Sequence, residues 1–213
     1  QRGAGPVRAA GGCRVTCVEL RWQVRGEIAA DYGYSLFSAV CQRRDTRLHD
    51  DEAPWTMSPV QVEQGIERQG TLLVERGTLA IRCAVELVPD FAGLYAPTGL
   101  AIRETGALQL SPAPTVHVLR PASVLAADRV MIKSATLERG RRHFGEAVEN
   151  RLRAERVTYG AVRVGAPFRM SVVGRECDGF AVEIEGLSER DSLYLQECGL
   201  GGRVRMGCGF LRG

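Results

Sequence analysis

The first regular pattern in the chain is a strict alternation of apolar and polar side chains. In residues 18–24 every even position is apolar and every odd position is polar. A period of two puts successive side chains on opposite faces of an extended chain, so this segment predicts a half-buried strand, and Gly26 is expected to end it. Asp31 is then expected to cap a helix running to about Arg43, whose apolar residues recur at helical spacing: Tyr34, Phe37, Val40 and Cys41.

The middle of the first half is rich in residues that favour strands. Residues 71–74 and 78–87 flank the segment 75–77, which contains a glycine and predicts a hairpin turn. Residues 108–119, interrupted by two prolines, predict two further strands. The first half therefore reads strand, helix, two strands, a short helix or loop, and strand.

The second half follows the same order. Residues 124–132 predict a strand and 138–156 the strongest helix of the chain, because Phe144, Val148 and Leu152 recur every four residues. Strands are predicted at 161–173 and 180–184 with a turn near 177–179. Ser188 then caps a short helix that Gly199 stops, and a last strand covers 208–211. The predicted fold class is α+β, with tandem ferredoxin-like (RRM-like, βαββαβ) modules and a C-terminal glycine-rich loop. The predicted division is a flexible leader at 1–12 and modules at 13–119 and 120–213.

Composition adds a bias toward arginine. The 28 basic residues exceed the 25 acidic ones by three, and every basic residue except Lys133 is arginine. Arginine binds phosphate edge-on and stacks on bases, although a GC-rich genome would produce the same bias.

Cysteine usage argues against a metal site. The seven cysteines form no C-x-x-C pair, and no histidine lies close to Cys13 and Cys17 in the sequence. We expect no metal and no cofactor, with the cysteines acting as small core residues of a reduced, cytoplasmic protein. No run of 18 apolar residues occurs and residues 1–12 have no apolar signal core, so we expect neither a membrane span nor a secretory signal.

The C-terminal segment 199–209 carries the most specific chemistry. It holds two arginines, Arg203 and Arg205, among five glycines: Gly199, Gly201, Gly202, Gly207 and Gly209. Glycine permits positive φ, and bare backbone N–H groups can cradle a phosphate that arginine then binds as a fork. The segment therefore predicts contact with nucleic acid. A tight hairpin with incidental arginines is the alternative.

The predicted helix 138–156 is a second basic element. Arg139 and Arg142, three residues apart, share one face, with Arg153 and Arg156 further along. Such a face suits the phosphates of an RNA hairpin, because A-form RNA is recognised mainly through its shape and backbone. Glutamates on the same helix leave an ordinary solvated face as the alternative.

Together, the order of elements and the glycine-rich segment resemble the CRISPR-associated endoribonucleases that process precursor crRNA, within the RAMP superfamily. Their C-terminal loop has the form G-x-G-x5-G-x-G, which the glycines at 199, 201, 207 and 209 match. The resemblance is greatest to the MYXAN subtype and spans about residue 15 to the end. It rests on these segments: Arg25-Gly26, Ala30-Asp31-Tyr32-Gly33-Tyr34, Leu48-His49, Pro59-Val60, Leu119-Arg120-Pro121 and Val130-Met131-Ile132-Lys133.

The resemblance implies metal-independent RNA cleavage, in which a ribose 2′-OH attacks the adjacent phosphate and expels a 5′-hydroxyl. It also implies a crRNA repeat hairpin and other CRISPR effector-complex subunits as partners. Two histidines of the subtype are replaced here by Tyr32 and Ser58, which leaves His49 as the candidate acid or base. Tyr32 is the candidate for orienting the 2′-OH, and Lys133 and Arg205 are candidates for stabilising the phosphorane charge.

Two other interpretations stay open. The replaced histidines are compatible with a non-catalytic subunit of the same superfamily, which holds the hairpin without cutting it, and with a type IV or transposon-linked variant. Besides the endoribonuclease and the non-catalytic subunit, the third interpretation is an unrelated tandem ferredoxin-like protein that binds a small ligand. Failure to bind any repeat hairpin would favour this third interpretation.

Overall fold

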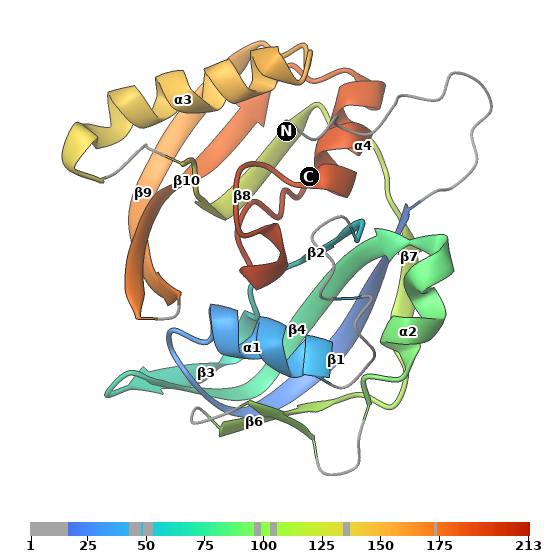
Figure 1. Ribbon diagram of the computed structural model, residues 1–213. Coiled ribbons are helices and arrows are strands. Elements are labelled where there is room, and N and C mark those ends of the chain that lie inside the picture. Colours follow the sequence, from blue (N-terminus) through green and yellow to red (C-terminus); the bar gives the residue numbers. More distant parts are fainter. Residues whose placement is uncertain are drawn as a thin grey trace.

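Two antiparallel sheets make up two bodies, one above the other in Figure 1. The computed structural model describes residues 17–42, 48, 53–95, 99–102, 106–133, 137–172 and 174–213. In the described part, no helix is long and apolar enough to cross a membrane.

The first body is a seven-stranded sheet with two helices. Its strand order is β2-β4-β1-β6-β5, with β3 pairing with β4 and β7 pairing with β1. The apolar side of the β1 alternation is buried as predicted, from Val18 to Val24. The elements are β1 (Cys17–Ala29), α1 (Gly33–Gln42), β2 (Trp55–Met57), β3 (Gln61–Arg68), β4 (Thr71–Ala84), α2 (Val88–Ala92), β5 (Leu100–Ile102), β6 (Gly106–Leu110) and β7 (Thr115–Val118).

The second body is a three-stranded sheet of order β8-β10-β9, with α3 against β9. Its elements are β8 (Val124–Val130), α3 (Gly140–Ala154), β9 (Ala161–Val172), β10 (Arg175–Glu185), α4 (Glu189–Cys198) and the short 3₁₀ helix η4 (Val204–Met206). The strand predicted at 208–211 is reduced to one bridge, between Ala126 and Arg212. That bridge adds the chain end beside β8 and completes the βαββαβ order of the second body. The first body has the same order with additional strands, since β2, β4, β1 and β6 lie side by side with α1 and α2 between them in sequence, and the predicted fold class is confirmed.

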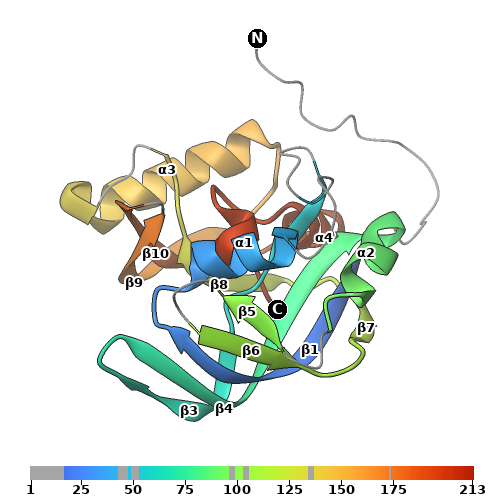
Figure 2. The same ribbon diagram turned by 60° about the horizontal axis from the view of Figure 1, so that its bottom comes forward.

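The two hydrophobic cores interlock. The first core includes Met170 and Val172 from the far end of β9, and Met206 and Cys208 from the glycine-rich segment. The amide of Ser171 donates to the Asp31 carboxylate at 2.6 Å, which adds a polar tie between the bodies. Figure 2 shows α3 and the β3–β4 hairpin at opposite ends of the molecule, with η4 next to α1 between them. The glycine-rich segment is therefore packed between the bodies rather than hanging from the second one.

Three glycines that the sequence suggested as strand ends or turns lie inside strands instead. Gly26 is in β1 at a bulge, Gly77 is in β4 and Gly179 is in β10. A Cβ on these residues would lie 2.1, 2.7 and 2.2 Å from the carbonyl oxygens of Ala107, Gln61 and Val130, respectively. Each glycine thus permits close approach of a neighbouring strand. The predicted turns at 75–77 and 177–179 are wrong, and the β3–β4 turn falls at 69–70.

The chain passes from the first sheet to the second between Val118 and Val124. This crossing lies beside the boundary expected at residue 120, although the division into domains stays a prediction. The expected leader, 1–12, is outside the described residues.

Candidate nucleic-acid interface

Backbone hydrogen bonds hold the glycine-rich segment against β8. The amide of Gly202 donates to the Met131 carbonyl at 2.8 Å, and the amide of Gly209 donates to the Arg129 carbonyl at 2.5 Å. On its other side η4 contacts α1 and β2, and Gly207 packs against Pro59. The segment therefore crosses from one body to the other (Figure 1).

The segment needs glycine for its backbone shape. Gly199, Gly201, Gly207 and Gly209 have φ values of 70°, 85°, 84° and 65°, a left-handed region that other residues occupy at a cost. The expected phosphate cradle is only partly available, however. The amides of Gly202 and Gly209 donate to carbonyls of the β8 region, as described above. A further three amides donate to carbonyls within the segment itself: those of Leu200, Met206 and Cys208. These five N–H groups are not free to bind a phosphate.

Arg205 lies at the contact between the bodies. Its Nη1 donates to the Leu48 carbonyl at 3.2 Å, and its guanidinium carbon lies 5.4 and 5.6 Å from the ring centres of Phe37 and Trp55. The two rings stack, with centres 6.0 Å apart. Aromatic faces attract a guanidinium through cation–π contact. The half-buried Arg205 is thus held in place from α1, β2 and Leu48 at once.

Two further cations flank the start of the segment. Met131 bridges to Gly201, so the exposed Lys133 follows β8 close to this point in the chain. Arg203 is exposed and has a left-handed φ of 61°, and its carbonyl accepts the amides of Met206 and Cys208. The structure thus places Arg203 and Arg205 in the segment and Lys133 two residues after Met131, the residue that bridges to it.

Tyr32 does not lie where the sequence placed it. Only 2% of the residue is exposed, and its hydroxyl accepts the amide hydrogen of Val60 at 2.7 Å. Burial raises the pKa of the phenol. The expectation that this phenol orients a ribose 2′-OH is not met, because the side chain faces the interior. Tyr34, expected in the core, is 37% exposed.

Ser58, the other residue at a histidine position of the subtype, is also fully buried. Its hydroxyl accepts the Ala80 amide at 2.9 Å. Both replaced positions therefore serve the packing beneath the glycine-rich segment.

His49 lies outside the described residues. The residue before it, Leu48, is buried, and its carbonyl accepts hydrogen bonds from Arg205 and from Trp55 Nε1, both at 3.2 Å.

Arg129 is a site residue that the sequence analysis missed. This half-buried side chain of β8 lies with its guanidinium carbon 5.9 Å from the centre of the Tyr32 ring, while its carbonyl holds Gly209. The sequence could have indicated Arg129, because it alternates with Leu125 and Ala127 and so lies on the same, buried face of the strand.

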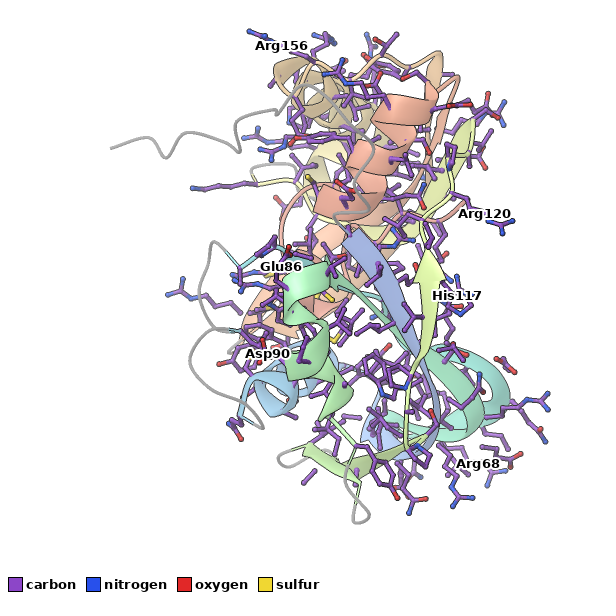
Figure 3. All side chains as sticks on the ribbon, turned by 90° about the vertical axis from the view of Figure 1, so that its right-hand side faces the viewer. Arg68, Glu86, Asp90, His117, Arg120 and Arg156 are labelled. Atoms are coloured by element: carbon purple, nitrogen blue, oxygen red, sulfur yellow. The ribbon has the colours of Figure 1, made fainter. Side chains whose placement is uncertain are left out.

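The basic helix α3 lies apart from the glycine-rich segment. Its Phe144, Val148 and Leu152 pack against the second sheet, as the periodicity predicted, and the helix lies at the top of Figure 1. The predicted binding residues Arg139, Arg142, Arg153 and Arg156 are all exposed. Arg142 pairs with Glu146 at 3.3 Å and Arg153 with Glu149 at 3.1 Å, whereas Arg139 Nη1 lies 3.5 Å from His143. Figure 3 places Arg156 at one end of the molecule, far from Arg68. The predicted binding residues therefore form two groups. One comprises Arg142 and Arg153 on α3 with Arg139 just before the helix and Arg156 just after it, and the other lies on the glycine-rich segment.

Other candidate chemistry is sparse. Among the described residues, no three His, Cys, Asp or Glu side chains gather as they would to hold a metal ion. His117, on the edge strand β7, lies with Nε2 2.9 Å from the Thr115 hydroxyl.

Likeness to solved structures shows the fold. A structure described as "CRISPR associated protein Cas6" superposes with a TM-score of 0.70 at 16% identity, covering 92% of this chain and 99% of the other. Another, "An RAMP protein binding different RNA substrates", gives 0.67 at 14% identity, covering 92% and 98%. The fold is the tandem ferredoxin-like fold of the RAMP proteins.

Sequence comparison gives the family. The family model described as "Cas6 Crispr" matches residues 18–213. The "CRISPR-associated endonuclease Cas6" of Myxococcus xanthus (strain DK1622) is 35% identical over 195 residues, which is 90% of this chain and 79% of that relative. The chain belongs to the Cas6 family, and the resemblance predicted from its motifs is confirmed.

Proposed function

We propose that this chain is a metal-independent endoribonuclease that cuts CRISPR repeat RNA and stays on the 3′ hairpin as a subunit of an effector complex. The name of its Myxococcus relative supports the activity. The observation that carries the proposal is the fixed position of Arg205, clamped between the stacked rings and the Leu48 carbonyl on a segment that joins the two bodies.

In the proposed reaction the ribose 2′-oxygen forms a bond to the adjacent phosphorus, and the bond from phosphorus to the 5′-oxygen breaks. The products are a 2′,3′-cyclic phosphate and a 5′-hydroxyl. The 2′ proton passes to a base, and the leaving oxygen receives one from an acid. We assign the role of acid or base to His49. General acid–base catalysis typically raises the rate by about 10²–10⁴-fold.

Arg205 and Lys133 stabilise the charge of the crowded phosphorane, and Arg203 binds a neighbouring phosphate. We assign Tyr32 and Arg129 a supporting role, because the buried phenol holds Val60 and the Arg129 carbonyl holds Gly209. A site that depends on arginine is slow, which suffices for an enzyme that cuts once and keeps its product.

In this proposal α3 and its two ends bind the stem of the RNA hairpin, through Arg142 and Arg153 on the helix, Arg139 before it and Arg156 after it. The ion pairs of Arg142 and Arg153 are exposed, and such pairs on a helix contribute only about 0.3–0.5 kcal/mol each. Phosphate oxygens can therefore replace the glutamates as partners at little cost.

A non-catalytic hairpin-binding subunit is the second candidate. It is favoured by the burial of Tyr32 and Ser58, which occupy the positions of two histidines in the resembled subtype. In this candidate the same arginines hold the RNA and no cut is made.

One assay separates the two. The protein is incubated with a 5′-labelled repeat RNA from its own organism in excess EDTA, alongside the same RNA carrying a 2′-deoxyribose at the cleavage site. A single cut at the hairpin base of the first RNA only, with a 2′,3′-cyclic phosphate on the labelled fragment and a 5′-hydroxyl on the downstream fragment, supports the enzyme. Binding of both RNAs without a cut supports the scaffold, and binding of neither contradicts both.

Variants locate the site in the same assay. Arg205→Ala and His49→Ala are expected to lower the cleavage rate at least about 100-fold, in line with the loss of one preorganised charge or one acid–base group. Arg76→Ala is the matched control, because Arg76 is 62% exposed on β4 and pairs only with Glu63 among the described residues.

A further inference from the structure

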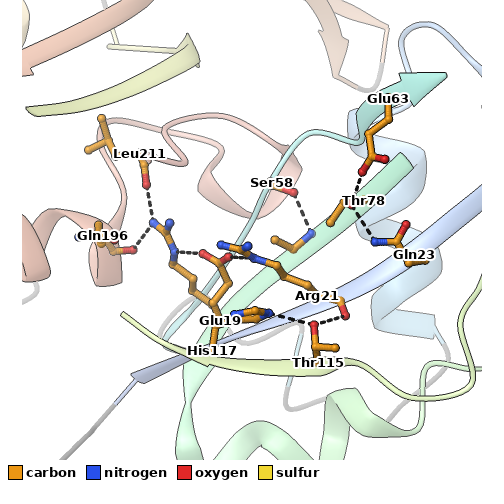
Figure 4. A network of polar contacts seen from close by, with 12 residues as sticks. Glu19, Arg21, Gln23, Ser58, Glu63, Thr78, Thr115, His117, Gln196 and Leu211 are labelled. Carbon is orange, nitrogen blue, oxygen red and sulfur yellow. Dashed lines mark hydrogen bonds and ion pairs between the residues drawn. The ribbon is translucent and has the colours of Figure 1, made fainter. Parts of the chain in front are cut away.

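One buried arginine of the first sheet contacts the chain on both sides of the glycine-rich segment. We call the residues just before and just after the segment, at Gln196 and Leu211, its two stems. Arg82 lies on β4 and is 3% exposed. Its Nη1 donates to the Leu211 carbonyl at 2.6 Å and to the Gln196 carbonyl at 3.0 Å (Figure 4). Gln196 is in the last turn of α4, just before Gly199, and Leu211 follows Gly209. A single guanidinium thus clamps the chain where it enters and where it leaves the segment.

The charge of Arg82 is compensated within the same sheet. Its Nε donates to Glu19 Oε2 at 2.7 Å, and Arg21 pairs with the other carboxylate oxygen. Glu19 and Arg82 are register partners on β1 and β4, so the strand pairing itself aligns them. Burial raises the pKa of Glu19, but Arg82 and Arg21 outweigh it and hold that pKa below its usual range. Glu19 therefore stays ionised and keeps the guanidinium oriented.

The same contact fixes two neighbouring segments. The guanidinium carbon of Arg82 lies 4.0 Å from the ring centre of Phe210. The side-chain amide of Gln196 donates to the Arg120 carbonyl at 2.8 Å, in the stretch where the chain crosses from the first sheet to the second. A buried ion pair costs desolvation energy that its attraction barely repays, so stability alone does not explain it. Because the Arg82 guanidinium bonds to both stems, the geometry indicates that it holds the glycine-rich segment in position.

We propose that Arg82, oriented by Glu19, is a positioning residue that sets the glycine-rich segment, and with it Arg203 and Arg205, against the RNA backbone. The inference rests on the proposed function for its effect on cleavage. Its structural part, the clamp on both stems, is testable without RNA.

Arginine is required here for its shape. The planar fork supplies donors in fixed directions, so that one side chain serves Glu19, Gln196 and Leu211 together. Lysine carries the same charge as a point on a flexible stem and cannot hold this geometry. Arg82→Lys therefore tests position while keeping the charge, and Glu19→Gln tests the orientation of an intact Arg82. Arg76→Lys, on an exposed pair of the same strand, is the matched control.

The first readout is amide hydrogen exchange, followed by mass spectrometry of peptides covering 199–209 and, as the reference, α3 at 140–154. For Arg82→Lys and Glu19→Gln we expect exchange in 199–209 to accelerate at least about 10-fold, with 140–154 unchanged and the Arg76→Lys control like the parent protein. Unchanged exchange in 199–209 overturns the proposal, and so does equal acceleration in both peptides, which marks a general loss of stability.

The second readout is single-turnover cleavage of the repeat RNA over a range of protein concentrations. Displacement of a reacting group by about 1 Å can cost up to about 10²-fold in rate. We expect the maximal rate to fall at least about 10-fold and the half-saturating concentration to change less than about 3-fold. A change in the half-saturating concentration alone overturns the positioning role. If the parent protein does not cut, the proposed function fails, and hydrogen exchange still decides whether the clamp exists.

Discussion

Replacing Gly209 with alanine tests whether the glycine-rich segment is fixed by close backbone approach. Gly209 has a φ of 65°, and a Cβ there would lie 2.1 Å from the Leu200 carbonyl oxygen. Gly174 has a similar φ of 72°, but nothing lies within 4 Å of its Cβ position. The pair of variants Gly209→Ala and Gly174→Ala therefore shares the backbone strain and differs in the clash.

The expected sizes follow from these two contributions. Alanine in the left-handed backbone region lowers the free energy of unfolding by roughly 1–2 kcal/mol. About 0.4–1 kcal/mol of this is offset because alanine makes the unfolded chain less flexible than glycine does. Forcing an extra group into a packed site adds about 1–3 kcal/mol. One kcal/mol lowers the thermal midpoint of a chain of this size by roughly 2–4 °C. We expect a shift of about 2–4 °C for Gly174→Ala and about 6–12 °C for Gly209→Ala.

The assay is thermal unfolding followed by circular dichroism, with urea unfolding as a second measure of the free energy. Equal midpoints for the two alanine variants would refute the reasoning, since they would mean that the Leu200 carbonyl does not confine Gly209.

Three further predictions follow from single contacts. Ser188→Ala removes the acceptor for the Asp191 amide at the start of α4 and should cost about 1 kcal/mol in urea unfolding; no loss would mean that the cap does not stabilise the helix. Tyr32→Phe leaves the Val60 amide without its acceptor and should cost about 1–3 kcal/mol of unfolding free energy, while cleavage stays within about 3-fold; loss of cleavage at full stability would restore a catalytic phenol. If about six phosphates are bound, log K should fall with log salt at a slope of roughly −4, and Arg142→Ala should reduce it by about 0.7, whereas a flat salt response would count against nucleic-acid binding.

Patterns that depend on neighbours in sequence were predictable. The alternation of β1, the four-residue spacing in α3 and the Ser188 cap of α4 each arise from local geometry, and all three are found where expected. The glycines at 26, 77 and 179 misled, because the strand that approaches each of them comes from elsewhere in the chain. A sequence alone does not distinguish such a glycine from one in a turn.

The cations of the candidate site are evident in the sequence, whereas the residues that hold its backbone in place are not. Arg203 and Arg205 belong to the glycine motif itself, and Lys133 lies two residues after Met131, which bridges to Gly201. Tyr32 was expected at the site and Tyr34 in the core, but Tyr32 is buried and Tyr34 is exposed. The reason is that α1 begins at Gly33, so Tyr32 precedes the helix and its side chain points inward. Arg82 sits in an otherwise apolar run, and only the strand register shows that it faces Glu19 and the second body.

The most direct test of the account is the structure of the protein with a repeat RNA carrying a 2′-deoxyribose at the cleavage site. We predict the scissile phosphate within hydrogen-bond distance, about 3 Å, of the guanidinium of Arg205 or Arg203, between the two bodies. An RNA whose scissile phosphate lies on another face, with both arginines unbound, would contradict it.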